Sequence, residues 1–217
     1  MSLIGRRARP IPRDEGKLRD ARLFIVATED TYAPKQYFGF FSHSRIHVEI
    51  LETEHGAGND PKRVVNRLVK FAEDYQIKED DQLWALLDTD HWVEGSHKPG
   101  LIEAIKDARQ RGYRVAMSNP CFELWLLLHH EETAAVTFPN CDAVGARIRE
   151  VKGEFNKKNL KSEHYPQPNI VVAIERAKAL EKDPGKAGSE YWPESNASRV
   201  YLLMDELRSA GLLLPAE

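Results

Sequence analysis

The sequence predicts an α/β fold, in which a parallel sheet of about four strands is flanked by helices and followed by a C-terminal helical extension. Three observations predict it. Short apolar runs alternate with amphipathic helical patterns up to about residue 130, and only helical patterns follow residue 140. In addition, two of the apolar runs are followed within two residues by an acid. Alternating strands and helices are typical of parallel sheets with right-handed crossovers.

Four segments have the length and composition of strands, and they are 23–27, 47–51, 83–87 and 113–118. The runs at 23–27 and 83–87 are apolar throughout, which is typical of strands that are buried on both faces. The run at 47–51 alternates between apolar and polar residues, so we expect one of its faces to be exposed.

Helix signals lie between these strands. An aromatic segment at 37–41 is expected to begin a short helix. Asp60 as N-cap and Pro61 at the first position open an amphipathic helix. Pro99 opens another helix, which Gly112 closes, and 122–129 is a strongly apolar helix.

Past residue 140 we expect three more helices, at 144–155, 170–182 and 198–210. The chain therefore divides into an N-terminal arm at 1–20, an α/β core at 21–135 and a helical extension at 136–217 that packs on the core. The arm is rich in Arg, Pro and Gly, which is typical of a flexible or loosely docked segment.

The composition limits the protein class. A chain of 217 residues with 41% hydrophobic residues can form one core, and a net charge of −3 gives no sign of a nucleic-acid partner, although a local basic patch can be hidden in such a total. No apolar run approaches the roughly 18 residues of a membrane span. Two cysteines fit a reducing compartment and no signal-peptide pattern is visible, so we expect a cytoplasmic protein that does not contact a membrane.

The most informative motif is the pair Asp88 and Asp90, which directly follows the apolar run 83–87. Residues two apart on an extended strand point to the same side, so both carboxylates can face one cation. Buried carboxylates are costly unless they are neutralised, and Mg²⁺ or Mn²⁺ prefers oxygen ligands. The alternative is a strand-end turn in which Asp88 caps the next segment.

Glu29 lies just past the first predicted strand, after Thr28. The carboxyl ends of parallel strands lie on one edge of a sheet, so Glu29, Asp88 and Asp90 are expected to converge on a metal ion. Glu29 is alternatively an exposed loop acid or an acid that favours a helix N-terminus, and Asp30 can play either part.

The segment 118–130 follows the fourth strand, so its beginning should lie at the same edge. Ser118 or Asn119 is expected to cap the helix, which places Glu123 in its first turn near the metal site. The alternative for Glu123 is the acid of a capping box. Asn119 is also a candidate contact to the substrate.

The other side chains of this segment have simpler interpretations. Trp125, with Leu126 and Leu128, is expected in the core. His129 and His130 end the helix, where cations suit the helix dipole. Cys121 is interpreted as a small buried residue rather than a nucleophile, because no histidine partner is identifiable.

Lys157, Lys158 and Lys161 form a local basic group. They are either a solvated loop or an arm that contacts phosphates, and the N-terminal arginines have the same two interpretations.

A Glu after the first strand and an Asp-x-Asp after a later one resemble the Toprim arrangement of topoisomerases, primases and related nucleases. More closely, residues 22–130 resemble the RloB-like family. The matching segments are 25–30, 37–38, 60–61, 87–90 and 118–129, the last reading SNPCFELWLLLH. Asp30 replaces a family glycine, and Ala33-Pro34 replaces Thr-Glu. Phe155-Asn156-Lys157 is similar to a Tyr-x-Lys pattern of the family, which makes Lys157 the preferred lysine.

The resemblance implies a metal-dependent nuclease that hydrolyses DNA or RNA in bacterial anti-phage defence, of the abortive-infection kind. Asp88, Asp90 and Glu29 would hold Mg²⁺ or Mn²⁺, with Glu29 alternatively acting as a general acid or base. Glu123 would help to bind a second ion, and Lys157 would stabilise phosphate charge. Asn119, Lys158 and Lys161 are the remaining candidate substrate contacts.

Two other functions stay open. The chain is alternatively a regulatory or binding subunit of a partner ATPase, which would be a separate protein because no P-loop pattern is present. It is alternatively a nucleotidyl or phosphoryl transferase with the same metal site. The sequence leaves the choice of nucleic acid open and is compatible with a homo-oligomer.

Overall fold

The computed structural model describes residues 21–30, 32–53, 60–90, 92–93, 95–182 and 189–212. The predicted arm at 1–20, with its arginines, lies outside these ranges. The described strands form one five-stranded sheet in the order β2-β1-β3-β4-β5. Their bounds are β1 (Arg22–Thr28), β2 (Ile46–Leu51), β3 (Gln82–Asp88), β4 (Arg114–Asn119) and β5 (Ala197–Ser198).

The sheet is parallel except at one edge. β1 pairs in parallel with both β2 and β3, and β3 pairs in parallel with β4, which confirms the four predicted strands and the α/β fold class. β5 adds an antiparallel edge strand, in which Ser198 pairs with Ser118. Two residues are too short to give a periodic signal, so the sequence did not predict this strand.

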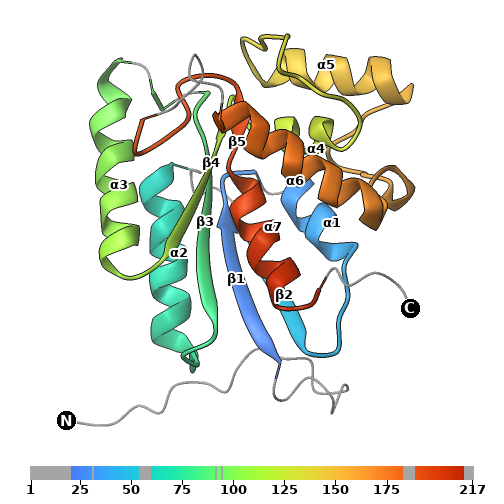
Figure 1. Cartoon of the computed structure of the whole chain (residues 1–217). Helices are drawn as coiled ribbons and strands as arrows, with labels where there is room; N and C mark the ends of the chain where they lie inside the picture. Colours follow the sequence, from blue (N-terminus) through green and yellow to red (C-terminus); the bar gives the residue numbers. More distant parts are fainter. Residues whose placement is uncertain are drawn as a thin grey trace, which may run out of the picture.

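Helices cover both faces of the sheet (Figure 1). They are α1 (Ala33–Gly39), α2 (Pro61–Asp74), α3 (Lys98–Gln110), α4 (Glu123–Leu128), α5 (Cys141–Lys152), α6 (Gln167–Lys182) and α7 (Val200–Ser209), with short 3-10 helices η1 (Gly95–His97) and η2 (Ser162–His164). α2 and α3 lie on one face, and α1, α4, α6 and α7 lie on the other. The predicted helices of the C-terminal extension are therefore present.

Successive side chains along each strand point to opposite faces of the sheet, so a separate hydrophobic core forms on each face. On β1, Leu23 and Ile25 pack into the core under α2 and α3, whereas Phe24 and Val26 pack into the core under the other helices. The second core also holds side chains from α6 and α7, so the extension shares a core with the sheet. The boundaries between arm, core and extension stay predictions. None of the described helices is both long and apolar enough to cross a membrane.

The observed ends of two helices agree with the capping residues that the sequence predicts. Asp60 accepts a hydrogen bond from the backbone N–H of Arg63 at 3.1 Å, and Pro61 begins α2, as predicted. Gly112 lies just after α3 with φ at 78°, a left-handed conformation that glycine adopts without strain.

The predicted cap of α4 is wrong. Asn119 is the last residue of β4, the Asn119–Pro120 peptide is cis, and α4 begins only at Glu123 without a side-chain cap. The side chains of Ser118 and Asn119 form hydrogen bonds outside α4 instead. The Ser118 and Ser198 hydroxyls lie 2.9 Å apart, and the Asn119 amide donates to the Pro193 carbonyl at 2.9 Å.

The interpretation of His129 and His130 as cations is also wrong. His129 is buried, its Nε2 lies 3.1 Å from the Tyr37 hydroxyl, and burial lowers its pKa to about 3. Burial likewise lowers the pKa of His130 to about 4. Both rings are therefore neutral at physiological pH, because burial outweighs any attraction to the helix terminus.

Candidate metal centre

The candidate site lies where the strand order changes direction. β2 extends the sheet on one side of β1, and β3 and β4 extend it on the other. Ligands bind beside the carboxyl ends of strands at such a switch point. β1 and β3 are paired in parallel, with Thr28 opposite Leu86, so the residues that follow them reach the same edge.

Glu29 contacts the end of β3 directly. Its Oε1 accepts a hydrogen bond from the backbone N–H of Asp88 at 3.1 Å, and its Oε2 accepts one from the indole N–H of Trp92 at 2.6 Å. Burial raises the pKa of Glu29 to about 8 despite these two donors, and the charges of Asp90 and Asp60 add to the rise. Glu29 is therefore a partly buried, hydrogen-bonded acid at this edge of the sheet rather than an exposed loop acid.

Asp88 is the last residue of β3 and lies among other acids. Burial raises its pKa well above the usual range, and the nearby charges of Glu29 and Glu123 raise it further. The backbone fixes the turn that follows. The N–H of Thr89 donates to the Ser118 and Pro120 carbonyls at 3.0 and 3.1 Å. The Asp-Thr-Asp turn is thus fastened to the segment between β4 and α4.

Glu123 and the two cysteines lie beside this turn. The thiol of Cys141 donates to Asp90 Oδ2 at 3.1 Å. Burial raises the pKa of Glu123, with a further rise from Asp30, although the Cys121 thiol lowers it by hydrogen bonding. Burial also raises the pKa of Cys121, which agrees with an unreactive buried thiol rather than a nucleophile.

Lys157 approaches the same acids from the loop after α5. Its Nζ lies 3.6 Å from Asp30 Oδ2 and 3.9 Å from Glu123 Oε1. Burial lowers the pKa of Lys157, but the charges of Asp30 and Glu123 raise it more, so the side chain is a cation. We call Glu29, Asp30, Asp88, Asp90 and Glu123 the acidic cluster. The sequence analysis interpreted Asp30 as a loop acid or a helix N-terminal acid, whereas the structure places it beside Lys157 and Glu123.

Gln36 of α1 is a further residue that the sequence did not single out. Its Nε2 donates to the Lys157 carbonyl at 2.7 Å, and its Oε1 accepts from the N–H of Leu160 at 2.8 Å. A glutamine in a short helix carries no motif, so nothing in the sequence could have identified it. It holds the loop that carries Lys157.

Three predicted substrate contacts have other partners. The amide of Asn119 holds the Pro193 carbonyl, the Nζ of Lys158 lies 4.8 Å from the ring centroid of Tyr32, and the Nζ of Lys161 is paired with Glu154. Their roles toward a substrate stay predictions.

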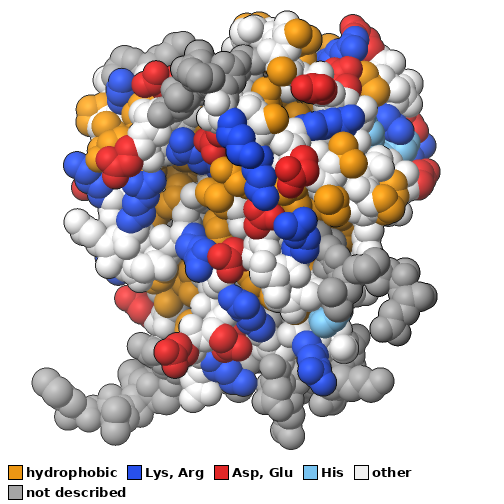
Figure 2. All heavy atoms as spheres, in the orientation of Figure 1, with side chains coloured by type: hydrophobic (Ala, Val, Ile, Leu, Met, Phe, Trp, Pro, Cys, Tyr) orange, Lys and Arg blue, Asp and Glu red, His pale blue; other side chains and the backbone are white. Residues whose placement is uncertain are grey.

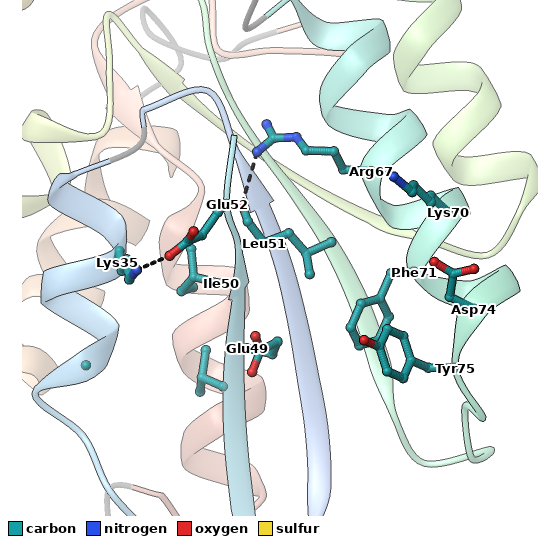
Figure 3. A pocket seen from close by; sticks show the side chains of 12 residues that line it. Lys35, Glu49, Ile50, Leu51, Glu52, Arg67, Lys70, Phe71, Asp74 and Tyr75 are labelled. Atoms are coloured by element: carbon teal, nitrogen blue, oxygen red, sulfur yellow. Dashed lines mark hydrogen bonds and ion pairs between the residues drawn. The ribbon is translucent and has the colours of Figure 1, made fainter. Parts of the chain in front are cut away.

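A cavity of about 470 Å³ beside β2 is separate from the acidic cluster (Figure 3). Basic and acidic side chains balance in its lining, which includes Lys35, Glu49, Glu52, Arg67, Lys70 and Asp74 but no member of the acidic cluster. Arg67 links the two regions, because its guanidinium donates to the carbonyls of Thr28 at 2.6 Å and Leu51 at 3.0 Å. Burial lowers the pKa of Arg67, and the charge of Glu29 opposes this.

Three of these acids carry donors of the type that a hard divalent cation takes, although among the described residues the three ligand atoms that lie within 4.8 Å of one another belong to Cys121, Glu123 and Cys141. Glu29, Asp88 and Asp90 offer carboxylate oxygens at one edge of the sheet, the ligands that Mg²⁺ and Mn²⁺ prefer. Burial is the main cause of the raised pKa values of Glu29, Asp88 and Glu123, and charges of neighbouring acids add to it. A bound cation would neutralise the buried negative charge.

Comparison with known proteins gives one result. A family model described as RloB-like protein matches residues 24–207, which extends past the acidic cluster into α7. No curated protein and no solved structure matches the chain. The Toprim likeness stays a prediction.

Proposed function

The chain belongs to the RloB-like family, and from this premise and the geometry of the acidic cluster we propose that it is a divalent-metal-dependent nuclease. One observation carries the proposal. Glu29, at the end of β1, is hydrogen-bonded to the backbone of Asp88, at the end of β3, and burial and neighbouring acids raise the pKa of both carboxyl groups. Such an edge suits a cation that acts on a phosphodiester.

In this proposal Glu29, Asp88 and Asp90 hold Mg²⁺ or Mn²⁺, and Glu123 helps to hold a second ion. When bound, the ion neutralises phosphate charge and makes water more acidic. Glu29 has a pKa of about 8, close to neutral pH, so it can alternatively give or take a proton at the attacking or leaving oxygen. Lys157 stabilises negative charge that develops on the phosphate.

The substrate would approach through the loop that carries Lys157, Lys158 and Lys161. Basic and acidic side chains are interspersed over the face shown in Figure 2. This distribution favours attraction of the nucleic-acid backbone to one short segment rather than to a whole face of the protein. The net charge of −3 agrees with this. We therefore propose that the metal and this short basic loop, rather than a broad basic surface, bind the DNA or RNA backbone.

The test is a cleavage assay with plasmid, single-stranded DNA and tRNA as separate substrates, with Mg²⁺ or Mn²⁺. We expect one of the nucleic acids to be cleaved, and the cleavage to be lost in EDTA and in the double variant Asp88→Ala/Asp90→Ala. Asp107→Asn is the matched control, since Asp107 of α3 is paired with Arg111, the residue just after that helix, and lies outside the acidic cluster. Cleavage that survives in the double variant overturns the proposal.

An inactive wild-type chain with both metals also contradicts an autonomous nuclease. Activity that returns only when a separate ATPase is added would favour the regulatory-subunit alternative.

We extend the proposal to bacterial anti-phage defence, which the family resemblance supports. Cells that carry the wild-type chain should give fewer phage plaques than cells that carry Asp88→Ala/Asp90→Ala. Equal plaque counts across a phage panel would contradict this extension and leave the nuclease proposal unaffected.

A further inference from the structure

Two thiols and a carboxylate meet beside the acidic cluster. Cys121 lies just before α4, Glu123 is the first residue of α4, and Cys141 is the first residue of α5. The sulfurs of the two cysteines and a carboxylate oxygen of Glu123 all lie within 4.8 Å of one another. We call these three residues the thiol cluster. A preference for hard cations does not explain the sulfurs, because Mg²⁺ and Mn²⁺ bind oxygen.

The spacing is close to that of a metal site. Zinc–sulfur bonds of about 2.3 Å in a tetrahedral site separate two sulfurs by about 3.8 Å, so side-chain rotations would suffice to close the thiol cluster on an ion. Cys121 is 1% exposed and Glu123 is 6% exposed, whereas Cys141 is partly buried. The cluster is thus shielded by the core on one side and accessible at Cys141.

Asp90 is a candidate fourth ligand, because its Oδ2 accepts the hydrogen bond of the Cys141 thiol at 3.1 Å. A metal that replaces the protons of both thiols would be held by two sulfurs and the Glu123 carboxylate, and a small shift of Asp90 would add a second carboxylate, a set that Zn²⁺ accepts. We propose that Cys121, Cys141 and Glu123, with Asp90, form a binding site for a thiophilic divalent cation such as Zn²⁺.

Binding of Zn²⁺ at the thiol cluster would compete with binding of Mg²⁺ or Mn²⁺ at the acidic cluster. Asp90 and Glu123 belong to both proposed sites, so an ion at the thiol cluster withdraws ligands from Mg²⁺ or Mn²⁺. This consequence rests on the proposed nuclease function, whereas zinc binding itself does not. We expect micromolar-range Zn²⁺ to inhibit cleavage, and we expect this inhibition to be weaker in Cys141→Ser.

The direct test is a Cd²⁺ titration of the reduced full-length chain under inert gas, followed through the ultraviolet thiolate-to-cadmium charge-transfer band. The chain has only two cysteines, so the band reports this pair alone. We expect one Cd²⁺ per monomer, a band that persists in excess Mg²⁺, and displacement of Cd²⁺ by Zn²⁺. The absence of a band, or one ion bridging two chains, overturns the proposal whether or not the chain is a nuclease.

The variants locate the site. Cys141→Ser should weaken Cd²⁺ binding by at least roughly 10- to 100-fold, since loss of even an outer-shell partner has effects of that size. Cys121→Ala provides a second variant, with circular dichroism to verify folding. Asp142→Asn is the control, because Asp142 is an exposed acid next to Cys141 in α5 but outside the thiol cluster. A band unchanged by Cys141→Ser, or lost in Asp142→Asn, contradicts the assignment.

Discussion

Carboxyl groups whose pKa is raised by burial are the main feature of the site at the scale of single residues. Glu29 has a pKa of about 8, and the pKa of Asp88 is raised by burial and by its acidic neighbours. Neither shift follows from the sequence, because both depend on how closely strands β1 and β3 bring the acids together. The sequence predicted which acids share an edge, but not their protonation.

These shifts determine how stability depends on pH without metal. A carboxyl group whose pKa is higher in the folded state gives stability that is fully present below its unfolded pKa and is lost as the pH rises through the folded pKa. For Glu29 that window runs from 4.5 to about 8. The metal-free protein should therefore become less stable from about pH 4.5 to pH 8.

Asp88→Asn tests this pH dependence. The amide cannot ionise, so the variant should be more stable than the wild type at pH 8 in EDTA by about 1 kcal/mol, within the usual range for relieving a strained functional site. The difference should shrink toward pH 5. Urea unfolding at both pH values measures it, and a variant that is less stable than the wild type at pH 8 would contradict the electrostatic account.

Comparison of variants at two neighbouring lysines distinguishes a catalytic role from a general attraction to phosphates. Lys157 lies against Asp30 and Glu123, whereas Lys158 lies over the ring of Tyr32. We expect Lys157→Ala to lower kcat by roughly 100-fold, as the loss of one electrostatic stabiliser does, and Lys158→Ala to change it much less. Equal losses in the two variants, measured by single-turnover cleavage, would show that Lys157 acts only through its charge on the loop.

At the scale of elements, what could be predicted depended on whether a local signal existed. The apolar runs of β1 and β3 and the Asp60-Pro61 start of α2 were correct because burial and capping act within a few residues. The predicted start of α4 was wrong. The amide of Asn119 does not cap the helix but donates a hydrogen bond to the carbonyl of Pro193, 74 residues away in sequence. β5 was missed for the same reason, since its pairing with β4 is a long-range contact.

α1 positions Lys157, the proposed catalytic lysine, through Gln36. The Gln36 side chain holds both the Lys157 carbonyl and the Leu160 N–H, so Gln36→Ala should release this loop. Cleavage should fall roughly 10- to 100-fold, because small misplacements near a reacting centre have effects of this size. The affinity for Mn²⁺ should stay unchanged, since Gln36 does not contact the proposed ligands.

Lys35→Ala is the matched control for Gln36→Ala. Lys35 is the preceding residue of α1, and its ammonium is paired with Glu52 beside β2, away from the acidic cluster. Calorimetric Mn²⁺ titrations and unfolding curves of both variants complete the comparison. A Gln36→Ala variant that loses metal affinity, or a Lys35→Ala variant that loses as much activity, would assign Gln36 a merely structural role.

At the scale of the whole molecule, the parallel sheet assembles the site from distant segments. The parallel pairing of β1 with β3, at the point where the strand order reverses, brings Glu29 to Asp88, which the strand pattern could predict. The approach of Cys141 to Asp90 spans 51 residues and depends on how α5 packs on α4, so only the folded chain shows it. The extension thus completes the site as well as the core.

The proposed nuclease site requires that Glu29, Asp88 and Asp90 hold one divalent cation. The most direct measurement is the anomalous scattering of Mn²⁺ in crystals of the reduced protein. We expect a single strong peak at about 2.1 Å from carboxylate oxygens of all three residues, in the range of hard-cation bonds. A peak that contacts none of them, or full Mn²⁺ occupancy in Asp88→Ala/Asp90→Ala crystals, would contradict the account.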